Sequence, residues 1–250
     1  MREEDTEYNF SHMKKLLIEA AAASPDVIIL PETWNTGFFP KENIKALSDK
    51  NAGRTKELLS FISREYKVSI IGGSVTEEKD GNIFNTCYIY NDKGENIASY
   101  SKTHLFTPMK EHDFYKAGEE VFTFTLAGVK AAVIICYDLR FPELSRKLSL
   151  EGAEILFVPS QWPKERISQL EILLRARAVE NQMFTVLCNS CGEFNKTVFG
   201  GNSLVSDPYG NIVLKAGEKE EIITADIDLD IIKNIRKTIP VFDDRRPELY

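Results

Sequence analysis

Cys136 is the residue of this sequence best placed for nucleophilic chemistry. It ends the apolar run at residues 131–136 and stands before Tyr-Asp-Leu-Arg, where a helical pattern begins. A helix N-terminus carries about half a positive charge and free N–H groups, so it favours a thiolate and can stabilise an oxyanion. The alternative is a buried structural cysteine, which is common in protein cores. Position alone leaves both interpretations open.

Three further charged residues could act with such a thiol, and two of them, Glu32 and Lys102, follow predicted strands. Glu32 follows Leu30-Pro31, and a carboxylate at the mouth of a buried sheet can serve as a general base. Lys102 lies in a Ser-Lys-Thr-His segment, and Glu111 lies in the polar stretch Lys-Glu-His-Asp. Each has an ordinary alternative, namely a capping or surface glutamate, a solvated lysine and a surface loop. Because ligands of open α/β sheets bind beyond the carboxyl ends of strands, these groups are candidates for one site.

The other chemical patterns are weak. The three histidines have no zinc-site spacing, and neither a Walker A loop nor a dinucleotide fingerprint occurs. Cys188 and Cys191 form a lone CxxC, which is more typical of two buried thiols than of a metal or redox site. We therefore expect neither a metal nor an organic cofactor.

The elements that must position these residues are predicted from apolar patterns. Buried strands are predicted at residues 26–30, 68–72, 130–136, 154–158 and 183–188. Apolar residues at helical spacing predict helices at residues 9–23, 55–66, 139–150 and 167–181. Turn sequences at residues 80–81, 91–94 and 207–210 predict hairpins, so the sheets are mixed. The hairpins favour a sandwich of two sheets with helices outside over an open doubly wound sheet.

Domain organisation and compartment follow from composition. The chain has 250 residues without a repeat or linker-like stretch, which predicts one domain over residues 1–250, with residues 238–250 as an extended C-terminal tail. A net charge of −7 argues against a nucleic-acid partner but not against a small anionic ligand. Four cysteines are too few for a disulfide framework, and no apolar run approaches the ~20 residues of a membrane span. We expect a cytoplasmic protein without a membrane partner.

Three segments together resemble the nitrilase, or carbon–nitrogen hydrolase, superfamily. They are Leu-Pro-Glu at residues 30–32, Lys-Thr-His-Leu-Phe at 102–106 and Cys-Tyr-Asp-Leu-Arg-Phe-Pro-Glu at 136–143. Residues 175–182, 201–203 and 245–250 are similar too, so the likeness covers nearly the whole chain. It implies a single-domain α/β fold, a four-layer α-β-β-α sandwich of two mixed sheets. It also implies an amidase that cleaves a non-peptide C–N bond and releases ammonia. The second and third segments look most like the omega-amidase branch, which hydrolyses the terminal amide of 2-oxoglutaramate and 2-oxosuccinamate.

The resemblance also implies catalytic roles. Glu32 would be the general base, Cys136 the nucleophile that forms a thioester, and Lys102 an oxyanion donor. The backbone N–H of Tyr137 would be a second oxyanion donor, and Glu111 would orient the site. This Glu-Lys-Cys triad needs no cofactor.

An omega-amidase must in addition bind the carboxylate of a 2-oxo acid, which arginine does bidentately. Arg166 and Arg140 are the candidates for this contact, but for Arg140 we rather expect a structural pair with Glu143 or another carboxylate. Trp162, Phe106 and Gln161 would line the substrate pocket. Trp162 and Phe106 could equally be ordinary core residues.

Assembly and chain start give two further expectations. The resemblance implies a homodimer formed through the helices that follow Cys136 and Ile167, with the tail reaching across. The family normally begins with a central strand before the first helix, but this sequence begins with Met-Arg-Glu-Glu-Asp. Without that strand, backbone N–H and C=O groups inside the sheet would lack hydrogen-bond partners, which would lower stability. We therefore expect residues upstream of Met1 in the natural protein, or low stability without them.

Three alternatives remain open from the sequence. The main one is another branch of the superfamily: a nitrilase, a carbamoyl-amino-acid hydrolase or an aliphatic amidase. The second is a catalytically inactive binding protein of the same fold, against which the intact Glu32, Lys102 and Cys136 argue. The third is a thiol redox protein that uses Cys188 and Cys191.

Overall fold

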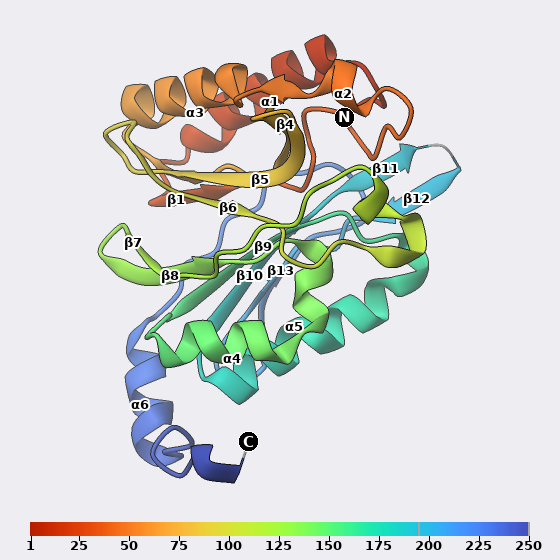
Figure 1. The fold of residues 1–250 in the computed structure, drawn as a ribbon. Helices are drawn as coiled ribbons and strands as arrows, with labels where there is room; N and C mark the ends of the chain where they lie inside the picture. The colour runs from red at the N-terminus through yellow and green to blue at the C-terminus, as the bar shows by residue number, and fades with distance from the viewer. Residues whose placement is uncertain (195, 250) are drawn as a thin grey trace.

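Two β-sheets pack face to face between two layers of helices in the computed structural model, which describes residues 1–194 and 196–249 (Figure 1). Helices α1 (Thr6–Ala21) and α3 (Gly53–Tyr66) cover the outer face of one sheet. Helices α4 (Pro142–Leu150) and α5 (Ile167–Asn181) cover the outer face of the other. The predicted four-layer α-β-β-α sandwich is therefore confirmed.

The first sheet is built around its longest strand, β5. Its spatial order is β1 (Val27–Ile29), β3 (Ser69–Ile71), β5 (Asn82–Tyr90), β4 (Val75–Lys79) and β2 (Asp49–Lys50), with β6 (Asn96–Ser101) also paired to β5. The pairs β1–β3 and β2–β4 are parallel, and the pairs that β5 makes are antiparallel. A short helix, α2 (Ile44–Leu47), precedes β2. The predicted hairpin turns at residues 80–81 and 91–94 join β4 to β5 and β5 to β6, so both are confirmed.

The second sheet has a parallel centre and antiparallel edges. Its spatial order is β14 (Ile212–Lys215), β13 (Leu204–Ser206), β10 (Phe184–Asn189), β9 (Ile155–Ser160), β8 (Val129–Val133) and β7 (Phe124–Leu126). The parallel pairs are β8–β9 and β9–β10, and their connections run through α4 and α5. A separate hairpin pairs β11 (Cys191–Phe194) with β12 (Thr197–Gly200).

Three apolar clusters hold the four layers together. Leu17 and Leu59 are fully buried in the cluster beneath α1 and α3. Ile89 and Phe157, from opposite sheets, share the cluster between the sheets. Leu148 belongs to the third cluster, beneath α4 and α5. Because both faces of each sheet are covered, the strands carry apolar residues on both faces, as the sequence pattern indicates.

The ends of the chain differ most from the sequence-based expectations. Helix α1 begins at Thr6, three residues before the predicted start, because the Asp5 side chain accepts a hydrogen bond from the Tyr8 amide and caps the helix. Helix α6 (Asp230–Thr238) was not predicted. The segment from residue 238, expected to be extended, instead makes a turn at residues 241–244 and a 3₁₀ helix at Pro247–Leu249.

Two further expectations concern the sheet edge and the membrane. β1 pairs with β3 along one edge, and the described residues place no strand along its other edge. The expected upstream strand stays a prediction. No helix in residues 1–194 and 196–249 has the length and apolarity needed to cross a bilayer.

Candidate active site

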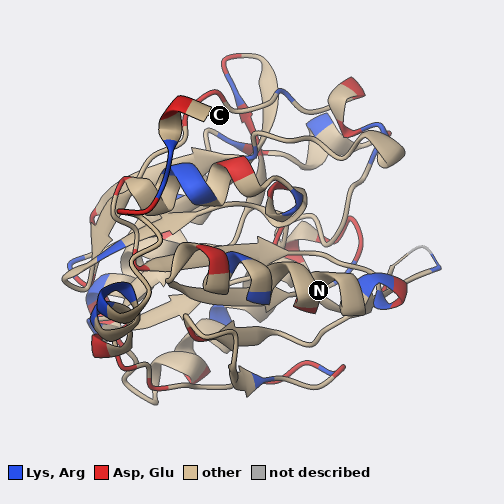
Figure 2. Ribbon diagram, turned by 90° about the horizontal axis from the view of Figure 1, so that it is seen from below, with Lys and Arg blue, Asp and Glu red and all other residues tan. Residues whose placement is uncertain are grey.

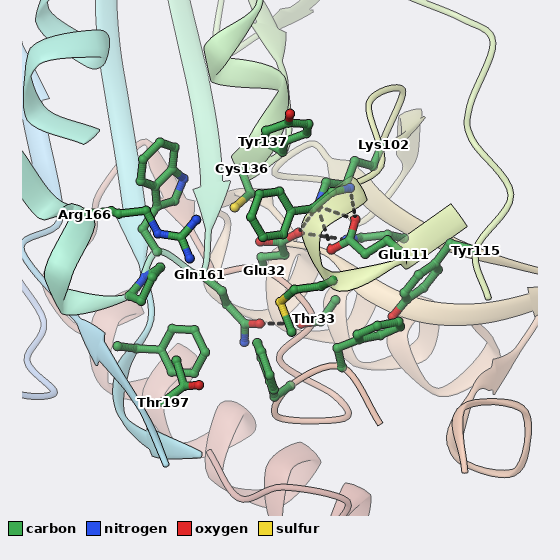
Figure 3. A pocket seen from close by; sticks show the side chains of 18 of the residues that line it. Glu32, Thr33, Lys102, Glu111, Tyr115, Cys136, Tyr137, Gln161, Arg166 and Thr197 are labelled. Atoms are coloured by element: carbon green, nitrogen blue, oxygen red, sulfur yellow. Dashed lines mark hydrogen bonds and ion pairs between the residues drawn. The ribbon is translucent and has the colours of Figure 1, made fainter. Parts of the chain in front are cut away.

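A cavity of about 310 Å³ collects the residues that the sequence singles out. Glu32 lies three residues beyond β1, Lys102 directly follows β6, Cys136 lies three residues beyond β8, and Gln161 directly follows β9. The two sheets thus contribute facing loops to one site. All nine predicted site residues line the cavity: Glu32, Lys102, Phe106, Glu111, Cys136, Tyr137, Gln161, Trp162 and Arg166. The structure thus brings these residues together around one cavity, and Figure 3 labels all of them except Phe106 and Trp162.

Cys136 occupies a sharp turn at the end of its strand. Its φ is +47°, in the left-handed region that residues other than glycine rarely adopt. A 3₁₀ helix, Cys136–Arg140, starts at this residue, and the Ile135 amide donates to Asp138 Oδ2 at 3.0 Å. Strained backbone of this kind is often found where a functional side chain must be aimed. Here it turns the sulfur toward the cavity and Glu32 (Figure 3).

Lys102 lies between two glutamates beneath the cavity. Its Nζ donates to Glu32 Oε1 at 3.0 Å and to Glu111 Oε2 and Oε1 at 3.0 and 3.2 Å. Its side chain is only 1% exposed. Asn85 Nδ2 also donates to Glu32 Oε1, at 2.9 Å. Two carboxylates around one ammonium give this buried cluster a formal charge of −1 when all three groups are ionised.

The electrostatics keep Cys136 protonated at neutral pH. Burial raises the pKa of the Cys136 thiol well above its ordinary value, and the Glu32 carboxylate raises it further. The Lys102 ammonium and the Gln161 backbone N–H act in the opposite direction without reversing the result. Burial alone would lower the pKa of Lys102, but the two carboxylates outweigh it and raise that pKa well above its usual value. A thiol in this state needs a neighbouring base when it attacks, and Glu32 is in place for that.

Asp138 connects the Lys102 loop to the turn that carries Cys136. It is fully buried and accepts hydrogen bonds from the Thr103 hydroxyl at 3.0 Å and from the His104 amide at 2.8 Å. The same side chain accepts the bond from Ile135 that holds the Cys136 turn. One carboxylate thus fixes the lysine loop relative to the cysteine.

Glu111 has a second structural contact besides Lys102. Its Oε2 accepts a hydrogen bond from the Phe106 amide at 2.8 Å. The Phe106 ring packs edge-on against Tyr137, with 4.9 Å between the ring centroids. Glu111 therefore orders the wall of the cavity next to the residue that follows Cys136.

Two arginines line the cavity without a carboxylate partner. Arg140 donates to Gln169 Oε1 at 2.8 Å and lies over the Trp162 ring at 4.6 Å. Arg166 lies over the Phe106 ring at 5.3 Å. Within the described part of the chain, neither guanidinium has a carboxylate within 4.0 Å, so the expected structural pair of Arg140 with Glu143 is wrong. Both arginines remain able to bind an anionic ligand.

Gln161 differs from its expected role in substrate binding. Its Oε1 accepts a hydrogen bond from Thr33 Oγ1 at 2.9 Å, and its Nε2 donates to the Gly37 carbonyl at 2.9 Å. Both ends of the carboxamide thus contact the loop that carries Glu32. These contacts favour a bracing role for the side chain, while the Gln161 backbone N–H faces the thiol.

Several cavity residues carry no signal in the sequence. Asn85 and Tyr115 come from β5 and from the loop after Glu111, and both are neutral and buried. Tyr115 Oη lies 2.7 Å from Thr76 Oγ1. Apart from these, the residues that the sequence did not single out are Thr33, Phe38, Phe39, Met109, Pro163, Thr197 and Phe199. Only the pairing of strands distant in sequence brings these residues to the cavity.

Cys188 and Cys191 are free thiols at the end of β10 and the start of β11. Burial raises the pKa of Cys188 to about 12, which makes it a poor nucleophile. Within residues 1–194 and 196–249, no group of three or more His, Cys, Asp or Glu side chains is placed to hold a metal ion.

Comparison with known proteins identifies the family to which this four-layer fold and its cavity belong, that of the carbon–nitrogen hydrolases. The chain belongs to this family, because residues 1–237 match the carbon–nitrogen hydrolase family model. It is 40% identical to 2-oxoglutaramate amidase of Bacillus subtilis (strain 168), over 94% of this chain and 91% of that protein. It is 33% identical to Omega-amidase NIT2 of Xenopus tropicalis, over 97% of this chain and 91% of that protein.

A solved structure shows the same fold. The chain matches a point mutant of the amidase from Nesterenkonia sp. AN1 with a TM-score of 0.86 and 26% identity, over 100% of this chain and 91% of that one. That amidase carries a covalent acetamide adduct at its active-site cysteine.

Proposed function

We propose that this protein is an omega-amidase that hydrolyses the terminal amide of a 2-oxo acid such as 2-oxoglutaramate. The cavity carries this proposal. It holds a thiol, a base and an ammonium group at one side and, at its walls, two guanidinium groups that have no carboxylate partner among the described residues. The names of the bacterial and amphibian relatives support the same substrate class.

In the first half of the reaction, Glu32 accepts the thiol proton of Cys136 as the sulfur attacks the amide carbon. The carbonyl electron pair moves to oxygen, where the Lys102 ammonium and the Tyr137 backbone N–H donate hydrogen bonds. One such donor typically contributes about 2.7–4 kcal/mol to catalysis. The intermediate then collapses with cleavage of the C–N bond, and Glu32 returns the proton to the nitrogen, which leaves as ammonia. An acyl thioester remains on Cys136.

In the second half, water replaces ammonia. Glu32 accepts a proton from the water as its oxygen attacks the thioester carbon. The C–S bond breaks, Glu32 passes that proton to the sulfur, and the new carboxyl group loses the second proton of the water to solvent as the 2-oxo dicarboxylate leaves. Glu111 keeps Lys102 and the Phe106 loop in position through both halves, as its hydrogen bonds to each support.

Substrate selection is the role that we assign to the arginines. A 2-oxo acid has a carboxylate at the end opposite its amide, and a guanidinium binds a carboxylate with two parallel hydrogen bonds. Arg166 and Arg140 line the cavity that Cys136 enters, so either can hold that carboxylate. Arg166→Met and Arg140→Met should raise KM for 2-oxoglutaramate by at least ten-fold. They should change KM for a neutral aliphatic amide much less.

The remaining expectations on partners and compartment are part of this proposal. Helix α5 exposes Ile172 at 67% and Val179 at 47%, which supports a homodimer that covers this helix. The four cysteines are free, as in a reducing cytoplasm. Basic and acidic segments are interspersed on the helices and loops in Figure 2, which supports a small-molecule ligand rather than a nucleic acid.

The decisive experiment measures ammonia release from 2-oxoglutaramate beside glutamine, asparagine, an aliphatic amide, a nitrile and a carbamoyl amino acid. Cys136→Ala is the blank, and Cys188→Ala, which removes a different half-buried thiol, is the matched control. We expect selective turnover of 2-oxoglutaramate that Cys136→Ala abolishes and Cys188→Ala retains. Turnover of another substrate alone would assign the protein to a different branch of the family. Normal turnover by Cys136→Ala would refute the mechanism.

A further inference from the structure

The two oxygens of the Glu32 carboxylate have different surroundings. Oε1 accepts two hydrogen bonds, from Lys102 Nζ at 3.0 Å and from Asn85 Nδ2 at 2.9 Å. Among the described residues, no N–H or ammonium group donates to Oε2. A carboxylate oxygen with two charge-assisted or amide donors has little remaining basicity, so Oε2 is the oxygen able to take a proton.

The orientation of Asn85 is fixed by chemistry. An ionised carboxylate only accepts hydrogen bonds, so the amide nitrogen of Asn85 must face Glu32 and its oxygen must point elsewhere. The backbone of the same residue holds the other partner of Glu32, since the Lys102 amide donates to the Asn85 carbonyl at 2.9 Å. Strand β5 thus places one residue in contact with both Glu32 and the Lys102 segment.

Asn85 is not placed for stability alone. Its side chain is buried, with the residue only 2% exposed, and its Oδ1 has no hydrogen-bond partner within residues 1–194 and 196–249. An unsatisfied buried acceptor is destabilising, and an apolar residue of similar shape would avoid that cost. The contact that the asparagine provides and an apolar residue cannot provide is the donor to Glu32.

We propose that Asn85 is a positioning residue that fixes the rotation of the Glu32 carboxylate and reserves Oε2 for proton transfer with Cys136 and with the leaving ammonia. The inference rests on the proposed amidase reaction, in which Glu32 is the base. Because the Asn85 donor stabilises the ionised carboxylate, its loss makes Glu32 bind a proton at a higher pH. The acid limb of the pH–rate profile then moves to higher pH.

The test compares wild type with Asn85→Ala and the isosteric Asn85→Asp, which replaces a donor by an acceptor. The matched control is Asn35→Ala. Asn35 is equally buried, but its side chain exchanges 2.9 Å hydrogen bonds with the backbone of Thr76. Two profiles are measured from pH 4 to 8: kcat/KM for the amide that wild type hydrolyses best, and the rate of iodoacetamide alkylation of Cys136 by mass spectrometry. Thermal unfolding of each variant is recorded alongside.

We expect both acid limbs to move upward by about half a pH unit or more in Asn85→Ala and further in Asn85→Asp. Asn35→Ala should lose thermal stability but keep its limbs at the wild-type pH. Folded Asn85 variants with unmoved limbs would overturn the inference, as would an equal shift in Asn35→Ala. If wild type hydrolyses no amide, the proposed function fails, and the alkylation profile still decides the role of Asn85.

Discussion

Replacement of Asp138 by asparagine should damage stability and catalysis together. The two carboxylate oxygens of Asp138 have separate sets of donors. Oδ1 accepts from Thr103 Oγ1 at 3.0 Å, from the His104 amide at 2.8 Å and from His104 Nδ1 at 2.9 Å. Oδ2 accepts from Tyr100 Oη at 2.7 Å and from the Ile135 amide at 3.0 Å. Asparagine can replace only one of these two acceptors.

The magnitude follows from those contacts. If the asparagine oxygen takes the place of Oδ1, its NH₂ group faces the buried Ile135 N–H, and a donor meets a donor. An unsatisfied buried group costs about 1–3 kcal/mol, and a hydrogen bond to a neutral acceptor is weaker than one to a charged acceptor by about 1 kcal/mol. Asp138→Asn should therefore cost about 2–4 kcal/mol. For a chain of this size, 1 kcal/mol corresponds to about 2 °C, so the substitution lowers Tm by roughly 4–8 °C.

Calorimetry and ammonia release together test this reasoning. Asp207 is a matched control, because it accepts bonds from the Tyr209 and Asn211 amides in a turn that does not line the cavity. Asp207→Asn should lower Tm but leave kcat/KM near the wild-type value, whereas Asp138→Asn should lower both. A Tm for Asp138→Asn within 1 °C of wild type, or an unaltered kcat/KM, would refute the role of Asp138 as the link between the two loops.

Three further predictions concern charge. Glu32→Gln should bind substrate but lower kcat by about 10²–10⁴-fold, the usual contribution of acid–base catalysis, and a steady-state ammonia assay checks this. Lys102→Met leaves two carboxylates in the site without their cation, which should cost about 3–5 kcal/mol in the free energy of unfolding, measured with urea at pH 7. Burial raises the pKa values of Cys87, Tyr88 and Tyr115 in the folded state, because the neutral side chains are favoured there. The unfolded chain loses these protons at its ordinary pKa values, about 8.5 for Cys and about 10 for Tyr. The free energy of unfolding is therefore unaffected below those pH values and decreases as pH rises above them. The urea concentration at the unfolding midpoint should accordingly be lower at about pH 10.5 than at about pH 8. Equal midpoints at the two pH values would contradict this prediction.

The sequence reveals those site residues whose chemistry is unusual for their position. A charged residue shortly after a predicted buried strand, such as Glu32 after β1, stands out because it follows a pattern that predicts burial. Cys136 stands out for the same reason, and the resemblance to a family then assigns the roles. The layers are predictable because the apolar runs and hairpin turns are local signals.

The other residues of the site could not be predicted from the sequence, because their roles depend on contacts between segments that are distant in the chain. Asn85 is an ordinary polar residue within a strand, and its importance arises only when β5 brings it against Glu32, 53 residues earlier in the chain. Gln161 looks like a substrate ligand in sequence, but the Glu32 loop occupies both ends of its amide. Helix α6 was missed because its buried face consists of little more than Ile232 and Ile235 within a charged segment.

The charge pattern around Lys102 explains why the proposed reaction needs two glutamates. A buried lysine with a single carboxylate partner would lose that partner when Glu32 accepts the thiol proton, and burial would then favour the neutral amine. Glu111 prevents this, because its two oxygens contact Lys102 Nζ at 3.0 and 3.2 Å independently of Glu32. The ammonium thus stays charged at the moment when the oxyanion forms. The same arrangement keeps Cys136 protonated until a carbonyl group arrives to accept the negative charge.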